Sequence, residues 1–202
     1  MELLPMNKSL ESGTALTKRS VVTKILHALL LTAVIFQLAV SLFMEGPRTG
    51  RSPDALFILH QYGGYLAAAA LLAFWVWGIV RRGETQLGSL FPWFSRQRMA
   101  AIATDCRLHI VELRQLRLPA ADDRPLASAV HGLGLSIVTL MALTGVLWAT
   151  GWFSPASAEL LIATHKASAN LMWAYLVAHA GLAILHEFLG ERVLPKMFGR
   201  NS

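Results

Sequence analysis

The sequence predicts an all-α membrane protein: a four-transmembrane-helix bundle, with an amphipathic cytoplasmic helix between the second and third spans. Of the 202 residues, 54% are hydrophobic and only 15% are charged, and the mean hydropathy is +0.49, well above that of a soluble domain. The apolar residues gather in four blocks, each near the roughly 20 residues that a helix needs to cross about 30 Å of hydrocarbon. These two observations together predict four spans.

Turn residues mark the limits of the spans. Gly46-Pro47 and Pro53 separate the first two, Pro125 suits the first turn of the third, and a short turn that ends at Pro155 precedes the fourth. The spans are predicted at residues 21–44, 55–80, 126–150 and 158–188, with a loop at 81–125 and tails at 1–20 and 189–202.

The loop at 81–125 is too long to be a plain connection. Between Arg96 and Arg117, apolar residues recur with helical spacing beside a flank of arginines. A basic helix lying on the inner leaflet fits this pattern, and so does a small helix packed on the cytoplasmic end of the bundle. His109 lies beside the apolar face and is expected to be an interfacial side chain. That face comprises Met99, Ile102, Ala103, Cys106, Ile110 and Leu113.

The basic residues predict the orientation. All 18 Lys and Arg residues except Arg48, Arg51 and Lys166 fall at or beyond one end of the bundle. The positive-inside rule therefore predicts that the loop and both tails are cytoplasmic. Because the basic residues flank apolar spans, the net charge of +6 indicates topology and lipid headgroups, and no nucleic-acid partner is expected. The polar first twenty residues predict no cleaved signal peptide.

Five of the seven histidines lie well inside the predicted spans, and His186 lies at the inner boundary of the fourth. Ionisable side chains are costly inside a membrane and usually face a functional interior. Because the helices alternate in direction, these histidines form two layers. His27, His131 and His179 lie toward the inner side, and His60 and His165 lie toward the outer side.

The two layers suit two stacked flat cofactors. His165 and His179 are fourteen residues apart, which returns to nearly the same helix face roughly 21 Å further on. Gly63 and Gly64, soon after His60, leave room for a porphyrin beside the backbone. Two imidazoles on one iron fill both axial positions and favour electron transfer over oxygen binding. The single cysteine excludes a disulfide framework, a cysteine-based metal site and covalent haem attachment within this chain.

Each histidine also has a simpler interpretation, a hydrogen bond between neighbouring helices. His131 keeps this interpretation, because two other histidines share its depth. Its alternatives are a hydrogen bond to a haem edge, a contact in a quinone pocket, and substitution for an iron ligand. His186 is interpreted as a boundary residue, with a role in a quinone or proton path as the alternative.

These residues resemble the bacterial cytochrome b561 family of four-helix di-haem cytochromes, which includes hydrogenase-associated b subunits. The resemblance covers residues 20–198. It depends on His27 early in the first span, His60 at the start of the second and His131 in the third. In the fourth span it depends on the run His165-Lys-Ala-Ser-Ala-Asn-Leu and on His179 and His186. The segments Leu90-Phe-Pro-Trp-Phe-Ser95 and Leu143-Thr-Gly145 are weaker family features.

The resemblance implies a ligand set and its partners. It implies that His27 and His179 ligate an inner haem b, that His60 and His165 ligate an outer haem b, and that His131 binds no iron. Both haems would be non-covalent. The implied surroundings are membrane lipids, ubiquinone or menaquinone, and a periplasmic or membrane redox partner protein.

The function implied first is electron transfer across the inner membrane between a periplasmic donor or redox partner and the quinone pool, with no catalytic residue assigned. One alternative is a superoxide:ubiquinone oxidoreductase (superoxide oxidase), in which Arg48, Arg51 and Lys166 would attract the anion. Another is a cytochrome b anchor subunit of a hydrogenase or dehydrogenase complex, which the long loop favours. A haem-free transporter or scaffold is disfavoured, because the four spans show no paired repeat or broken helix.

Overall fold

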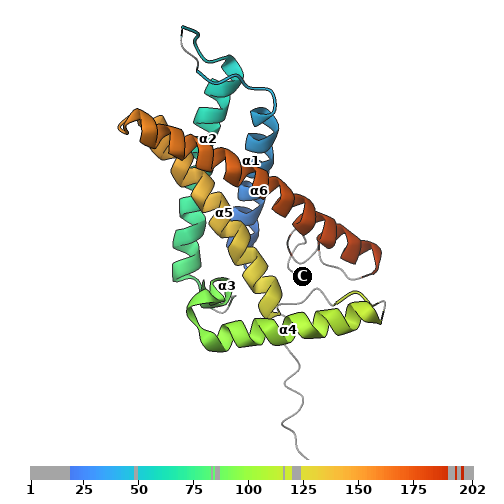
Figure 1. Cartoon of the computed structure of the whole chain (residues 1–202). Helices are drawn as coiled ribbons and strands as arrows, with labels where there is room; N and C mark the ends of the chain where they lie inside the picture. Colours follow the sequence, from blue (N-terminus) through green and yellow to red (C-terminus); the bar gives the residue numbers. More distant parts are fainter. Residues whose placement is uncertain are drawn as a thin grey trace, which may run out of the picture.

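The computed structural model describes residues 19–47, 50–82, 84, 87–115, 117–119, 124–190, 194 and 197. Four helices in this part of the chain are long and apolar enough to cross a membrane. The all-α architecture with four spans is therefore confirmed. In chain order the elements are α1 (Val21–Ser41), α2 (Ala55–Val80), α3 (Leu87–Leu90), a 3-10 helix η1 (Pro92–Phe94), α4 (Arg96–Arg114), α5 (Pro125–Ala149) and α6 (Pro155–Phe188) (Figure 1).

Side-chain caps and prolines fix where the long helices begin. Ser20 accepts from the backbone N–H of Thr23 at 3.2 Å and starts α1, and Asp54 accepts from that of Phe57 at 2.7 Å and starts α2. The fourth span begins at Pro155 and not at 158, because Ser154 caps the helix and Pro155 occupies its first turn. The first span ends at Ser41 and not at 44. The predicted tails lie almost wholly outside the described residues.

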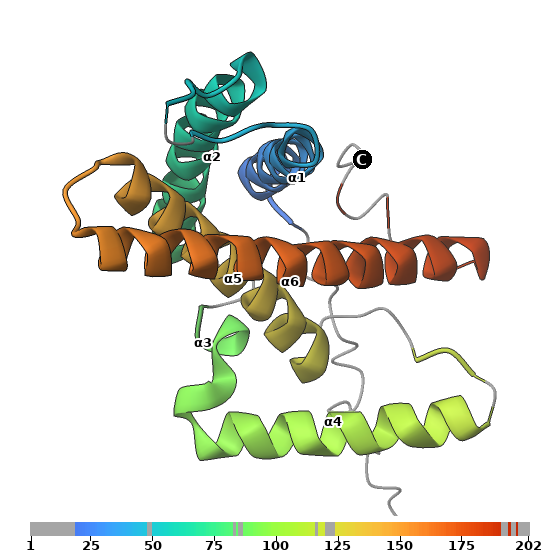
Figure 2. The same ribbon diagram turned by 45° about the horizontal axis from the view of Figure 1, so that its top comes forward.

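The long helices pack as two neighbouring pairs. α1 lies along α2, α5 lies along α6, and α2 contacts α5. A core of Leu38, Ile137 and Met172 joins α1, α5 and α6. Figure 2 shows α6 crossing α5 obliquely. With 34 residues α6 is roughly 50 Å long at 1.5 Å per residue, so it must tilt to fit the hydrocarbon layer.

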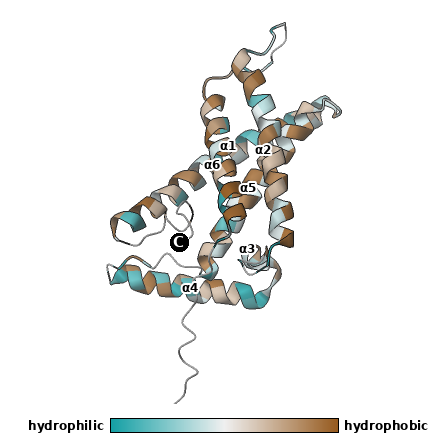
Figure 3. Ribbon diagram, turned by 180° about the vertical axis from the view of Figure 1, so that it is seen from behind, coloured by the Kyte–Doolittle hydropathy of each residue, from teal (hydrophilic) through white to brown (hydrophobic). Residues whose placement is uncertain are grey.

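The outer surface of the pairs is apolar, and α4 carries many of the hydrophilic residues (Figure 3). Side chains such as Leu66, Leu72 and Val177 are more than half exposed on the long helices. In a membrane these side chains face lipid, since lipid replaces water as their solvent. Below, the end of the bundle that carries α4 is called the α4 end, and the opposite end is called the far end.

The segment that follows α2 folds back against α5. The backbone carbonyl of Leu90 lies where a side chain on Gly132 would stand, so only glycine fits at that point of α5. Trp75 stacks on Phe91 with ring centroids 5.5 Å apart and donates to the Thr139 hydroxyl at 3.1 Å. These contacts join α2, the loop and α5 at the α4 end.

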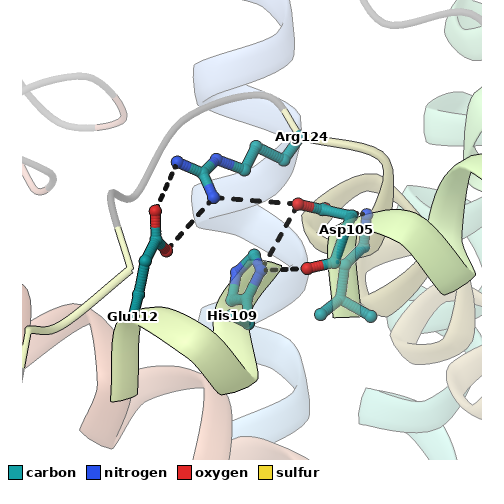
Figure 4. Close-up of polar contacts among 5 residues, drawn as sticks. Asp105, His109, Glu112 and Arg124 are labelled. Carbon is teal, nitrogen blue, oxygen red and sulfur yellow. Dashed lines mark hydrogen bonds and ion pairs between the residues drawn. The ribbon is translucent and has the colours of Figure 1, made fainter. Parts of the chain in front are cut away.

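Helix α4 is fastened to the start of α5 by a buried carboxylate. Asp105 is 4% exposed and accepts from the backbone N–H of Leu126 at 3.0 Å. A carboxylate is favourable there because the helix N-terminus carries a partial positive charge. His109 and Arg124 lie 3.3 and 3.8 Å from Asp105, and Arg124 also pairs with Glu112 at 3.3 Å (Figure 4). Of the two interpretations of this helix, packing on the end of the bundle is the one that the contacts support.

A second carboxylate ties α1 to the end of α2. Glu84 accepts from the Thr23 hydroxyl at 2.7 Å and from the backbone N–H of Ser20 at 3.2 Å, and it lies 3.7 Å from Arg81. Burial alone would raise the pKa of Glu84, but the hydrogen bonds from Ser20 and Thr23 and the charge of Arg81 outweigh it and lower the pKa below its usual value. The charged form therefore stabilises this junction.

Candidate haem sites

The structure brings His60 of α2 and His165 of α6 together near the far end. Their ring centroids are 6.2 Å apart, and the ring planes are nearly perpendicular at 88°. Two imidazoles that share one metal ion at a metal–nitrogen distance of about 2 Å have ring centroids roughly 6 Å apart. The spacing of this far-end pair thus fits one iron between the two rings.

A backbone carbonyl orients the His165 ring for that role. Nδ1 of His165 lies 2.9 Å from the carbonyl oxygen of Met141 on α5. When Nδ1–H donates to this oxygen, Nε2 keeps its lone pair and is free to bind a metal. Gly145 gives the ring its space, because a Cβ there would stand 3.0 Å from Cε1 of His165.

The space beside Gly63 and Gly64 is filled by α1. A Cβ on Gly63 would stand 3.1 Å from both Nε2 of Gln37 and the ring of Phe36, and one on Gly64 would stand 3.3 Å from the same Nε2. These glycines were expected to leave room for a porphyrin. In the structure they admit a buried amide instead.

At the α4 end, His131 of α5 and His179 of α6 are in edge contact, with ring centroids 5.2 Å apart and an interplanar angle of 79°. Tyr175 stacks on His179, with ring centroids 5.3 Å apart and an interplanar angle of 10°. Its phenol occupies the position that a side chain on Gly134 would take. Positive charges on His27 of α1 and on His179 would repel one another, so His27 is grouped with this pair. These three histidines are called the α4-end cluster.

The two sequence-predicted layers are therefore separate groups of side chains. Among the residues that the structure describes, no three His, Cys, Asp or Glu side chains converge as a simple metal-ion site requires. A haem iron needs only two axial protein ligands, since the porphyrin supplies the other four. His109 lies apart on α4, and His186 is buried near the end of α6.

Three groups that contact the candidate haem ligands were not predicted from the sequence. Gln37 carried a usable signal, because it is an amide within an apolar span. Tyr175 carried a weaker one, since it precedes His179 by four residues and so shares its helix face. The Met141 carbonyl carried none, because any residue has a carbonyl.

Comparison with known proteins identifies the family. Residues 18–200 match the family model described as prokaryotic cytochrome b561. The chain belongs to the prokaryotic cytochrome b561 family. It is a multi-pass inner-membrane b-type cytochrome that binds haem b and takes part in electron transfer. No curated protein and no solved structure matches the chain.

The far-end pair has the chemistry that haem b requires. Haem b binds through axial ligands alone, and bound between two imidazoles it supplies one-electron redox chemistry. The protein's part is to hold both imidazoles neutral with Nε2 available. The 6.2 Å spacing of the two rings fits a shared iron, and the Nδ1 contact of His165 meets the requirement for that ligand.

Proposed function

We propose that this cytochrome b561 holds two haems b and carries electrons across the membrane between a periplasmic donor or redox partner protein and the quinone pool. His60 and His165 would ligate one haem, and His27 and His179 the other. The observation that carries the proposal is the spacing of the far-end pair. Its ring centroids are 6.2 Å apart, which is the separation expected for two imidazoles that share one iron.

Helix α6 supports two irons on one path. It runs unbroken from Pro155 to Phe188 and carries one histidine of each group. The fourteen residues between His165 and His179 correspond to a rise of roughly 21 Å. Because a porphyrin extends well beyond its iron, the facing edges of the two haems would be much closer than that, and close edges favour electron transfer.

The charge distribution supports a cytoplasmic α4 end. Arg81, Arg82 and Arg124 lie at this end beside α4, which itself bears several arginines. By the positive-inside rule this end faces the cytoplasm, with both tails, and the far end faces the periplasm. The far-end haem would then receive the electron first.

We assign His131 to the quinone side of the path. Its side chain is exposed, and its ring touches that of His179. An imidazole beside a redox cofactor suits a hydrogen bond to a quinone carbonyl and transfer of a proton to it. His131→Leu should keep both haem spectra and slow haem oxidation by a quinone analogue in stopped-flow mixing. Unchanged oxidation rates with intact haems would contradict this assignment.

The outer cations support a protein donor over superoxide. Arg51 pairs with Glu45 at 3.1 Å, which reduces the positive field that would attract a small anion. Lys166 is exposed, and Arg48 lies outside the described residues. An exposed mixture of both signs suits docking of a redox partner.

The haem count tests the proposal. Pyridine haemochrome assay against protein concentration should give two haems per chain, and His60→Ala or His165→Ala should each reduce the count to one. His109→Ala is the matched control: it removes a histidine from α4, outside both groups, and should keep both haems. A count of one in the unaltered protein, or two haems in His60→Ala, would contradict the proposal.

A further inference from the structure

We propose that Gln37 is a positioning residue for the far-end haem, because it holds His60 of α2 from the neighbouring helix α1. The inference rests on the proposed ligation of that haem by His60. Gln37 is only 8% exposed and lies within an apolar span, where a buried amide costs free energy unless it is hydrogen-bonded.

The Gln37 amide reaches the backbone of His60 itself. Its Nε2 donates to the His60 carbonyl at 2.9 Å, so the contact lands on the residue that carries the imidazole. Gly63 and Gly64 form the slot for the amide, since a Cβ at either would press on Nε2. A hydrogen bond that served only to join two helices would not need a pair of glycines next to a proposed haem ligand.

Each of these two residues has one buried polar atom without a full hydrogen bond. Among the residues that the structure describes, Oε1 of Gln37 and Nδ1 of His60 have no hydrogen-bond partner. Oε1 only accepts, and Nδ1 must carry the proton when Nε2 binds iron. The backbone of Gln37 also interacts with the imidazole, although outside the geometry of a full hydrogen bond. Gln37 therefore bears on His60 at two points, since its side-chain amide donates to the His60 carbonyl and its backbone lies against the imidazole.

By fixing the His60 backbone, the Gln37 amide would keep the imidazole against the Gln37 backbone, much as the Met141 carbonyl holds the ring of His165. An acceptor at Nδ1 fixes the tautomer and the ring plane and raises the basicity of the ligating nitrogen. A more basic ligand stabilises oxidised iron, so the contact lowers the midpoint potential of the far-end haem. Loss of the amide should therefore raise that potential.

The test compares Gln37→Leu with Gln61→Leu. Gln61 follows His60 directly and donates to the Tyr65 hydroxyl at 3.2 Å, so it controls for an amide lost at the same depth. In a redox titration Gln37→Leu should retain two haems and raise the potential of the haem that His60→Ala removes. The low-spin electron paramagnetic resonance signal of that haem should shift as well. Gln61→Leu should change neither.

A Gln37→Leu protein with two haems and unshifted potential and signal overturns the inference, even if its thermal stability falls, because a packing role alone predicts that result. If Gln37→Leu does not assemble, Gly64→Ala decides, since its Cβ would stand against Nε2 of Gln37 alone and alanine suits a helix. It should shift the same haem, and no shift overturns the inference. Should His60→Ala keep both haems, the ligation itself is wrong. If His60→Ala loses one haem but Gln37→Leu changes neither the potential nor the resonance signal, the ligation stands and only the role of Gln37 is rejected.

Discussion

The two histidine groups differ in how completely the fold specifies them. The far-end pair has two rings at the separation of a shared iron, and a carbonyl orients one of them. The α4-end cluster has three imidazoles for two axial positions, and the two in edge contact are 5.2 Å apart, closer than a shared iron allows. The fold alone thus brings one candidate pair of ligands to the spacing of a shared iron, and at the other group it leaves two pairings open.

The two ends also differ in charge. Near the far end α1 and α2 are joined by the neutral amide of Gln37, whereas at the α4 end they are joined by the Glu84 carboxylate and Arg81. Asp105 adds a further buried carboxylate where α4 meets α5. Neutral contacts hold at every pH, and carboxylate contacts depend on ionisation. The Glu84 junction should therefore depend on pH, whereas the Gln37 contact should not.

The largest expected effect is the loss of one haem from the α4-end cluster, which distinguishes a role of His27 as ligand from that of His131. His27→Ala should remove the α4-end haem, as should His179→Ala, and each should halve the haem content. His131→Ala should keep two haems, because His131 is exposed whereas His27 is half-buried. Pyridine haemochrome assay on the three variants measures this. Loss of a haem in His131→Ala with two haems in His27→Ala would assign the edge-contact pair as the ligands.

An intermediate effect is expected at the far-end pair from Gly145→Ala. The added Cβ would stand 3.0 Å from Cε1 and 3.2 Å from Nδ1 of His165, so the ring must move by a few tenths of an ångström. The α-band and the redox potential of the far-end haem should shift, and its occupancy should fall in part. Reduced-minus-oxidised spectra measure both.

Gly181→Ala is the matched control for Gly145→Ala. It also adds a methyl group to a long helix, but no described residue outside that turn of the helix lies within 4 Å of the added Cβ. Its spectrum should equal that of the unaltered protein. An unshifted spectrum in Gly145→Ala would mean that the His165 ring is not confined by α5.

The sequence predicted the four spans and the two histidine layers because hydropathy and helical repeat are local properties. His60 and His165 could be grouped by depth alone, and the structure places their rings together. The contact between His131 and His179 could not be predicted, because depth does not determine which of three side chains at one level touch. That depends on the crossing of α5 and α6, which only the packing decides. The pairing of His27 with His179 remains a prediction.

The position of α4 shows the same limit. Periodicity predicts the helix but allows two placements, and the contact of Asp105 with the start of α5 decides between them. In the sequence Asp105 is an ordinary polar residue of an amphipathic helix. Gln37 differs, since a lone amide in an apolar span marks a special site by its position in the sequence alone.

The smallest expected effect is a pH dependence at the α4 end, tested by Glu84→Gln. The variant should lower the unfolding free energy by about 1–3 kcal/mol at neutral pH, because it weakens hydrogen bonds of a buried charged group to Ser20 and Thr23. The pKa of Glu84 is lowered in the folded state, so its contribution is complete above the ordinary value of 4.5. It is lost as the pH falls through the lowered pKa.

The stability difference between the unaltered protein and Glu84→Gln should thus be constant near neutral pH and shrink below pH 4.5. Haem release on heating in detergent, followed at several pH values, measures it. Glu45→Gln is the control at the far end, where the carboxylate is 46% exposed and pairs with an exposed Arg51, so solvent screens the ion pair and little should change. If Glu45→Gln destabilised the protein as much as Glu84→Gln, charge would matter equally at both ends. The contrast between the solvent-screened Glu45 pair and the buried Glu84 junction would then be wrong.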